Sequence, residues 1–207
     1  MSTHKIMILI AAVAVALTAG AALGGCGTNA TAPPGNPGSS QSVVARTHNQ
    51  ADIAFAQGMI PHHSQAVTMS TMATQRAGSP QVKDLAARIH TAQQPEIDQM
   101  SGWLRAWNAQ VPSASSPMDG MGQMDHGAGG QMPGMMSGDQ MQQLAQATGA
   151  AFDRMFLQMM ITHHQGAVTM ARTELSDGQD PEARQLAQRI IDSQQREITE
   201  MQAMLGA

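Results

Sequence analysis

The feature that most constrains this chain is an internal repeat at a fixed offset of 101 positions. The dipeptide His62-His63 returns as His163-His164. The two copies share Asp52, Phe55, Gln57, Met59, Ile60, Ala66, Val67, Thr68 and Met69, which match Asp153, Phe156, Gln158, Met160, Ile161, Ala167, Val168, Thr169 and Met170. Because the register holds throughout, the sequence predicts two similar units that pack against each other, and two copies are too few for a solenoid.

Within each copy the apolar residues follow a helical period. In the first copy Phe55, Met59, His62, Ala66 and Met69 are spaced alternately four and three apart, so they form one stripe along a helix. A second stripe runs through Val82, Ala86, Ile89, Gln93, Glu96, Met100, Trp103 and Trp107. Pro80 and Pro181 each follow a break in the pattern and are typical of the first residue of a new helix.

These stripes predict an all-α fold. We expect four helices of about 25 to 30 residues that form two antiparallel hairpins. One hairpin cannot cover its own apolar stripe, so two facing hairpins should make a four-helix bundle with approximate twofold symmetry. Pro61 and Pro95 interrupt the first copy, where the second has Thr162 and Arg196. The periodic pattern continues through both, which predicts kinks rather than helix ends.

The N-terminus has the character of a targeting segment. Lys5 precedes an apolar stretch from Ile6 to Leu23, which ends in Leu23-Gly24-Gly25-Cys26, a sequence similar to a bacterial lipobox. We predict a lipoprotein signal peptide at 1–25, a flexible tether at 26–46 that starts from a lipidated Cys26, and the bundle at 47–207. An uncleaved signal anchor is the alternative. Both place the bundle outside the cytoplasm, at the outer face of the bacterial cytoplasmic membrane or in the cell envelope.

The bundle is predicted to divide into repeat one at 47–110, a linker at 111–138 and repeat two at 139–207. The linker is rich in Gly and Met and cannot supply a packed core. It is either a linker without a further role or a flexible metal-chelating arm. The residues of this arm would be Met118, Met121, Met124, His126, Met132, Met135 and Met136.

Composition narrows the partners. The chain has 19 Met against three Phe, two Trp and no Tyr, and its net charge is −4. With no basic stripe and few aromatic residues for base stacking, we expect no nucleic-acid partner. Methionine inside the helices serves either flexible core packing or the binding of soft metals.

The residues around each histidine pair favour the second role. Imidazole suits several metals, whereas the neutral thioether narrows the choice to copper, with Cu(I) favoured and zinc or another divalent metal left open. The chain has one Cys and no Glu-x-x-His motif, which disfavours structural zinc and a di-iron site. The candidate ligands are Met59, His62, His63, Met69, Met160, His163, His164 and Met170.

Polar residues on the second stripe are expected to support these ligands. The supporting residues would be Gln93, Glu96, Gln194 and Glu197. A buried carboxylate needs a partner, and a carboxylate behind a ligating imidazole is a common arrangement. The alternative is a metal-free polar layer that fixes helix register. His48 and His90 have no counterpart in the other copy and are interpreted as incidental surface residues.

The sequence resembles the bacterial DUF305 family. The resemblance rests on Phe55-x3-Met59-Ile60-x-His62-His63-x2-Ala66-x2-Met69 and on Gln93-x2-Glu96-Ile97-x2-Met100-x2-Trp103-Leu104, and both patterns recur in the second copy. The second copy departs at Met204-Leu205, which replaces Trp103-Leu104. The resemblance implies an exported, ferritin-like four-helix bundle, and some members are associated with copper binding and copper tolerance.

Three hypotheses follow. The first is a membrane-anchored extracytoplasmic protein that sequesters or relays Cu(I), with a copper donor or acceptor protein as a possible partner. The second is a ferritin-like metallo-oxidoreductase that oxidises cuprous or ferrous ions, although no catalytic residues are identified. The third is a metal-free structural bundle of the envelope.

Overall fold

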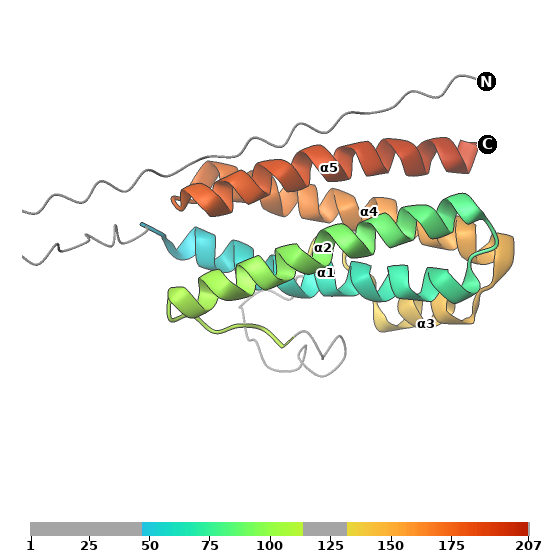
Figure 1. Ribbon diagram of the computed structural model, residues 1–207, viewed down its shortest axis with the longest axis horizontal. Helices are drawn as coiled ribbons and strands as arrows, with labels where there is room; N and C mark the ends of the chain where they lie inside the picture. The colour runs from blue at the N-terminus through green and yellow to red at the C-terminus, as the bar shows by residue number, and fades with distance from the viewer. Residues whose placement is uncertain (1–46, 114–131, 207) are drawn as a thin grey trace, which may run out of the picture. The chain divides into compact units, whose positions relative to one another are not determined.

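The computed structural model describes residues 47–113 and 132–206. Four long helices span α1 (Gln50–Arg76), α2 (Pro80–Ala106), α4 (Gly149–Asp177) and α5 (Pro181–Gly206), and a short helix α3 (Gly138–Gln146) precedes α4. The predicted all-α bundle of two helical hairpins is confirmed (Figure 1). The periodic pattern did not predict α3.

Local sequence explains where the helices begin. Asn49 caps α1 by accepting hydrogen bonds from the backbone of Ala51 and Asp52, and the Asp52 carboxylate accepts one in return from the Asn49 backbone. Pro80 begins α2, where its missing N–H costs no helical hydrogen bond. The helices α1 and α2 continue through Pro61 and Pro95, so the prediction that neither proline ends its helix is confirmed.

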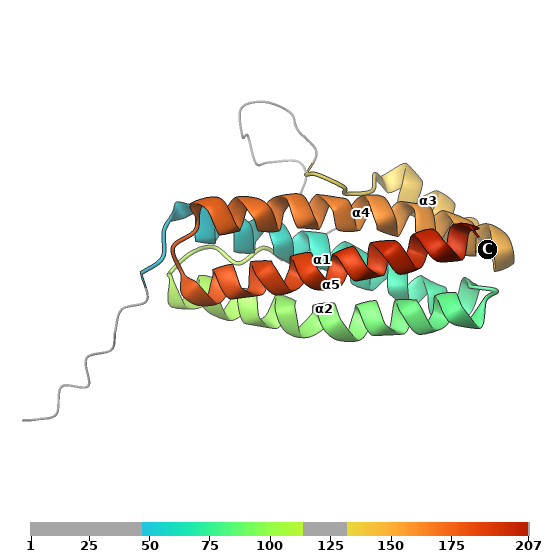
Figure 2. The ribbon, with the colours of Figure 1, turned by 90° about the horizontal axis from the view of Figure 1, so that it is seen from above.

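The two hairpins meet through their first helices. The helix α1 packs on α2 and on α4, and α4 packs in turn on α5 (Figures 1 and 2). Buried apolar residues fill two clusters, one that includes Phe55 and Leu104 and one that includes Phe152 and Phe156. Each such side chain contributes about 1.5–3 kcal/mol by leaving water.

Reciprocal contacts at the two ends fix the register of the hairpins. Asp52, near the start of α1, accepts backbone hydrogen bonds of 3.0 and 2.9 Å from the turn 179–180 before α5. Asp153, its repeat partner near the start of α4, accepts bonds of 3.0 and 2.8 Å from the turn 78–79 before α2. Each hairpin therefore holds the turn of the other, and this fixes how α1 lies along α4.

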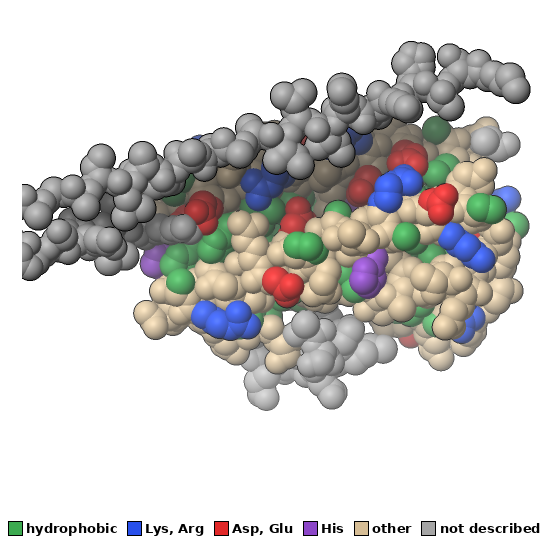
Figure 3. Space-filling view, in the orientation of Figure 1, with side chains coloured by type: hydrophobic (Ala, Val, Ile, Leu, Met, Phe, Trp, Pro, Cys, Tyr) green, Lys and Arg blue, Asp and Glu red, His purple; other side chains and the backbone are tan. Residues whose placement is uncertain are grey.

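The surface of the bundle is mixed in charge. Acidic and basic side chains are interspersed over the face drawn in Figure 3. Within residues 47–113 and 132–206, no helix has both the length and the hydropathy to cross a membrane. The predicted signal peptide, Cys26, the tether and the arm residues Met118, Met121, Met124 and His126 lie outside the described residues.

Candidate metal centre

The two histidine pairs lie opposite each other where α1 and α4 pack. All four imidazoles are fully buried. His62 and His163, which are equivalent in the repeat, are in direct contact, with ring centroids 3.8 Å apart and ring planes tilted by 38°. The stripe that predicted a core-facing position for each pair therefore brings the two copies together at this point.

The second histidine of each pair is held by a carboxylate from the other helix of its hairpin. His63 Nε2 lies 2.8 Å from Glu96 Oε2, and His164 Nε2 lies 2.6 Å from Glu197 Oε2. An ionised carboxylate only accepts hydrogen bonds, so each Nε2 carries the hydrogen. In the neutral imidazole the lone pair then lies on Nδ1, which is buried and has no partner among the described residues in either ring.

The first histidine of each pair differs between the copies. His62 Nε2 donates to the Pro133 carbonyl oxygen at 3.1 Å, which leaves its buried Nδ1 without a partner. In His163 both ring nitrogens are buried and have no hydrogen-bond partner within the described part of the chain. The centre is thus asymmetric, although the sequence around it is repeated.

Burial keeps His62 and His163 neutral. Desolvation is the main cause that lowers the pKa of His62 to about 3, and the neighbouring His63 adds to it. Desolvation also holds the pKa of His163 well below its ordinary value, with His62 as the next cause. Both rings are therefore uncharged near pH 7, which is the state that binds a metal ion.

The predicted methionines lie in two environments. Met59, Met69 and Met160 are fully buried within the apolar clusters, whereas Met170 is partly buried beside α1. Within the described residues, no group of three or more His, Cys, Asp or Glu side chains has the geometry of a metal site.

The four predicted supporting residues lie on α2 and α5, one glutamine and one glutamate on each helix. Gln93 and Gln194 are each 3% exposed, and their Oε1 atoms have no partner in the described part of the chain. Glu96 and Glu197 are more open, with side chains 21% and 18% exposed. The carboxylates can therefore reach both an imidazole and solvent.

The linker contributes a contact that the sequence did not predict. Residues 132–136, here called the strap, lie across α1 and α4. The Gln65 side chain donates to the Met136 carbonyl oxygen at 2.9 Å and accepts from the Met136 backbone N–H at 2.8 Å. Of the predicted arm residues, Met132, Met135 and Met136 lie in the strap, and Met136 is buried.

The two histidines interpreted as incidental lie outside the buried centre. His90 is exposed on α2. His48 stacks on Trp107, with ring centroids 4.8 Å apart.

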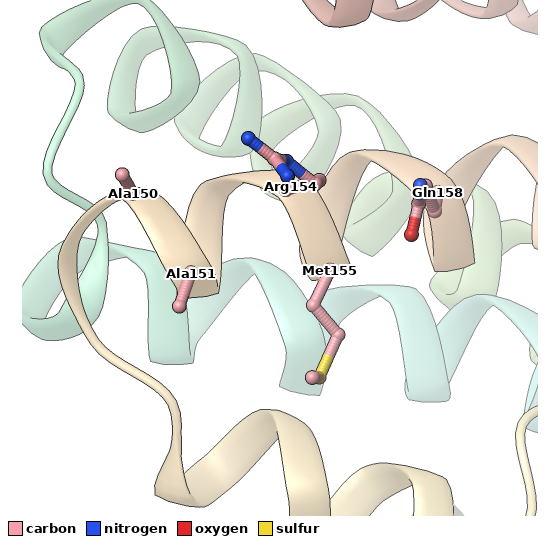
Figure 4. A pocket seen from close by; sticks show the side chains of 5 residues that line it. All are labelled: Ala150, Ala151, Arg154, Met155 and Gln158. Atoms are coloured by element: carbon pink, nitrogen blue, oxygen red, sulfur yellow. The ribbon is translucent and has the colours of Figure 1, made fainter.

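A surface pocket at the start of α4 contains no imidazole, and its Arg154 and Met155 side chains leave the helix in different directions (Figure 4). It is lined by Ala150, Ala151, Arg154, Met155 and Gln158.

A family model matches most of the bundle. The model describes a domain of unknown function, DUF305, and matches residues 52–205. The chain belongs to the DUF305 family. The resemblance drawn from the histidine motifs is therefore confirmed.

Solved structures of DUF305 proteins share the fold. A Streptomyces coelicolor DUF305 protein that is predicted to be secreted is 33% identical, with a TM-score of 0.65 over 75% of this chain and 92% of its own. CopM in its Cu(II)-bound form is 36% identical, with a TM-score of 0.62 over 75% of this chain and 95% of its own. CopM has also been solved bound to Cu(I) and to silver.

A curated relative matches a shorter stretch. Uncharacterized protein L153 of Acanthamoeba polyphaga mimivirus is 45% identical over 53 residues, which cover 26% of this chain and 35% of that protein. The chain therefore spans about a third of the length of this relative.

Proposed function

We propose that this DUF305 protein binds copper outside the cytoplasm, with Cu(I) as the favoured ion, and sequesters it or passes it on. The observation that carries the proposal is the contact between His62 and His163, two buried and neutral imidazoles on facing helices. The copper-bound and silver-bound forms of CopM, a relative with the same fold, support it.

The donor set fits a soft ion. The proposed ligands are drawn from His62, His63, His163 and His164 together with Met59, Met69, Met160 and Met170. Imidazole with neutral thioether selects copper over the harder divalent ions, and Cu(I) prefers sulfur to oxygen. Glu96 and Glu197 fix the ring orientation of His63 and His164, and such outer partners typically strengthen metal binding about 10-fold to 100-fold.

Export and anchoring belong to the same proposal. The lipobox-like Leu23-Gly24-Gly25-Cys26 supports a lipid anchor at Cys26, and the predicted secretion of the Streptomyces relative agrees with an extracytoplasmic position. A bundle that buffers copper at the outer face of a membrane would also need a protein that donates or accepts the ion.

Competitive titration with Cu(I) tests the proposal. The purified chain competes with a chromogenic Cu(I) chelator, and the His62→Asn/His163→Asn double variant should bind Cu(I) at least about tenfold more weakly. His90→Asn, at an exposed position on α2, is the matched control and should bind like the wild type.

Three further measurements complete the test. Circular dichroism establishes that the double variant is folded. Equal Cu(I) affinity of a folded double variant and the wild type would refute the proposal. A melting temperature that copper leaves unchanged would instead favour the metal-free bundle. Oxygen consumption upon Cu(I) or Fe(II) addition would favour the oxidoreductase.

A further inference from the structure

The strap lies where the two repeats differ. Gln65 on α1 and Gly166 on α4 occupy matched positions of the repeat. Gln65 holds the Met136 backbone through two hydrogen bonds, whereas a Cβ at Gly166 would lie 2.0 Å from the Pro133 carbonyl oxygen. One copy therefore supplies the side chain that binds the strap, and the other supplies the space that admits it.

The backbone of the strap is also fitted to this place. Gly134 has a φ of +78°, and a Cβ there would lie 2.6 Å from the Thr162 carbonyl oxygen. Positive φ and close backbone approach both favour glycine. With Pro133 accepting from His62, the strap is anchored to the bundle on either side of Gly134.

A second divergence lies where the ends of two methionine side chains approach the same point. Gly58, one turn before His62 on α1, matches Met159 of the second copy. A Cβ at Gly58 would lie 2.9 Å from Met170 Cε and 3.9 Å from Met132 Sδ. The absent side chain thus leaves room for the ends of both methionines, which lie within 4 Å of the same point.

We propose that Met132 and Met170 form an entry site that takes Cu(I) from solvent and passes it to the histidine centre, an inference that rests on the proposed function. Both side chains are partly exposed, whereas His62 and His163 are fully buried, so an incoming ion meets the thioethers first. Two neutral sulfur ligands hold Cu(I) or Ag(I) and discriminate against zinc and Cu(II).

Silver titration monitored by NMR tests the entry site. Ag(I) is a redox-stable probe for soft-ligand sites, and the methionine methyl groups are labelled with carbon-13. The Met132 and Met170 methyl resonances should shift together at low Ag(I), while zinc should leave both unchanged. In Met132→Leu, the Met170 methyl resonance should report Ag(I) binding that is at least about tenfold weaker. The loss of a direct ligand should weaken binding at least as much as the loss of an outer partner does.

Two variants act as controls. Met141→Leu removes a partly buried thioether from α3 and should leave both shifts unchanged. Gly166→Ala displaces the strap without touching a sulfur atom, so the Met132 response should be lost while Met170 remains in place.

The outcomes separate this inference from the proposed function. If Cu(I) still binds in competition but Ag(I) shifts neither methyl group, or shifts them independently, the entry site is refuted and the histidine centre stands. Unchanged affinity in both Met132→Leu and Met170→Leu also refutes it. If the wild type binds neither ion, both proposals fail.

Discussion

Glu174 provides a sharp test of how burial controls the stability of this bundle. Glu174 is 1% exposed near the end of α4, and its carboxyl group lies beside that of Asp52. Burial is the main cause that raises the pKa of Glu174 to about 8, and the neighbouring Asp52 carboxylate adds to it. The pKa of Asp52 itself is lowered, because its backbone hydrogen bonds together outweigh its burial.

The direction of the pH dependence follows from this shift. Between pH 4.5, the ordinary pKa, and pH 8, folded Glu174 holds a proton that the unfolded chain has released. The folded state binds more protons, so rising pH destabilises it. At about 1.4 kcal/mol for each pH unit, the loss of unfolding free energy has an upper limit of about 4–5 kcal/mol. Once Glu174 is ionised, it and Asp52 can shift toward water, so we expect a loss of about 2 kcal/mol.

The change Glu174→Gln removes the titrating group and keeps its shape. Urea unfolding, followed by circular dichroism, should show the variant gaining about 2 kcal/mol relative to the wild type between pH 5 and pH 8. Both proteins contain the same histidines, so the difference isolates residue 174. The matched control is Asp98→Asn on the exposed face of α2, which should show no such change. If the difference between Glu174→Gln and wild type is the same at both pH values, the reasoning is wrong.

Three further predictions concern packing, turn contacts and acid. Gly166→Ala should lower the free energy of unfolding by about 1–3 kcal/mol, because the added methyl group clashes with the strap. Gly102→Ala, which has open space around it on α2, should raise the free energy of unfolding by about 0.5–1 kcal/mol. Denaturant titration of both variants checks that the two changes have opposite signs. Asp153→Asn and Asp52→Asn should each cost about 1–2 kcal/mol by weakening the contact with the opposite turn, and equal melting temperatures of variant and wild type would contradict this. Because the folded pKa of His62 is about 3, acid from pH 6.5 downward should protonate the unfolded chain first and destabilise the fold, an effect that His62→Asn should reduce in unfolding at pH 5.

The fold could be predicted because the spacing of apolar residues within each helix determines which face of that helix is buried. The four-three spacing from Phe55 to Met69 fixes one buried face of α1 wherever the helix packs, and the fixed repeat offset assigns the same face to α4. The position of Glu96 on the second stripe likewise placed a carboxylate on the helix that faces His63, and in the structure Glu96 Oε2 lies 2.8 Å from His63 Nε2. Periodicity carries this information, because it depends only on spacing along one helix.

The parts that the sequence did not predict depend on contacts between distant segments. The strap contacts His62 and Gln65, which lie about 70 positions away in the sequence, so no local periodicity predicts it. The carboxyl group of Glu174 lies beside Asp52 only because the turn at 179–180 docks on α1. The short helix α3 was missed for a simpler reason, since its single buried residue, Leu144, gives no stripe.

A signal for the strap was nevertheless present in the repeat. Where two copies of a hairpin meet across a twofold axis, matched positions face equivalent surroundings, and a segment that contacts the two copies unequally can leave a difference between them. Gln65 against Gly166 and Gly58 against Met159 are such differences, and each adjoins residues of the strap. A single segment can cover a twofold centre only once, so one copy must bind it while the other makes room. These two mismatches therefore mark where the strap crosses the bundle, as the matched stripes mark its core.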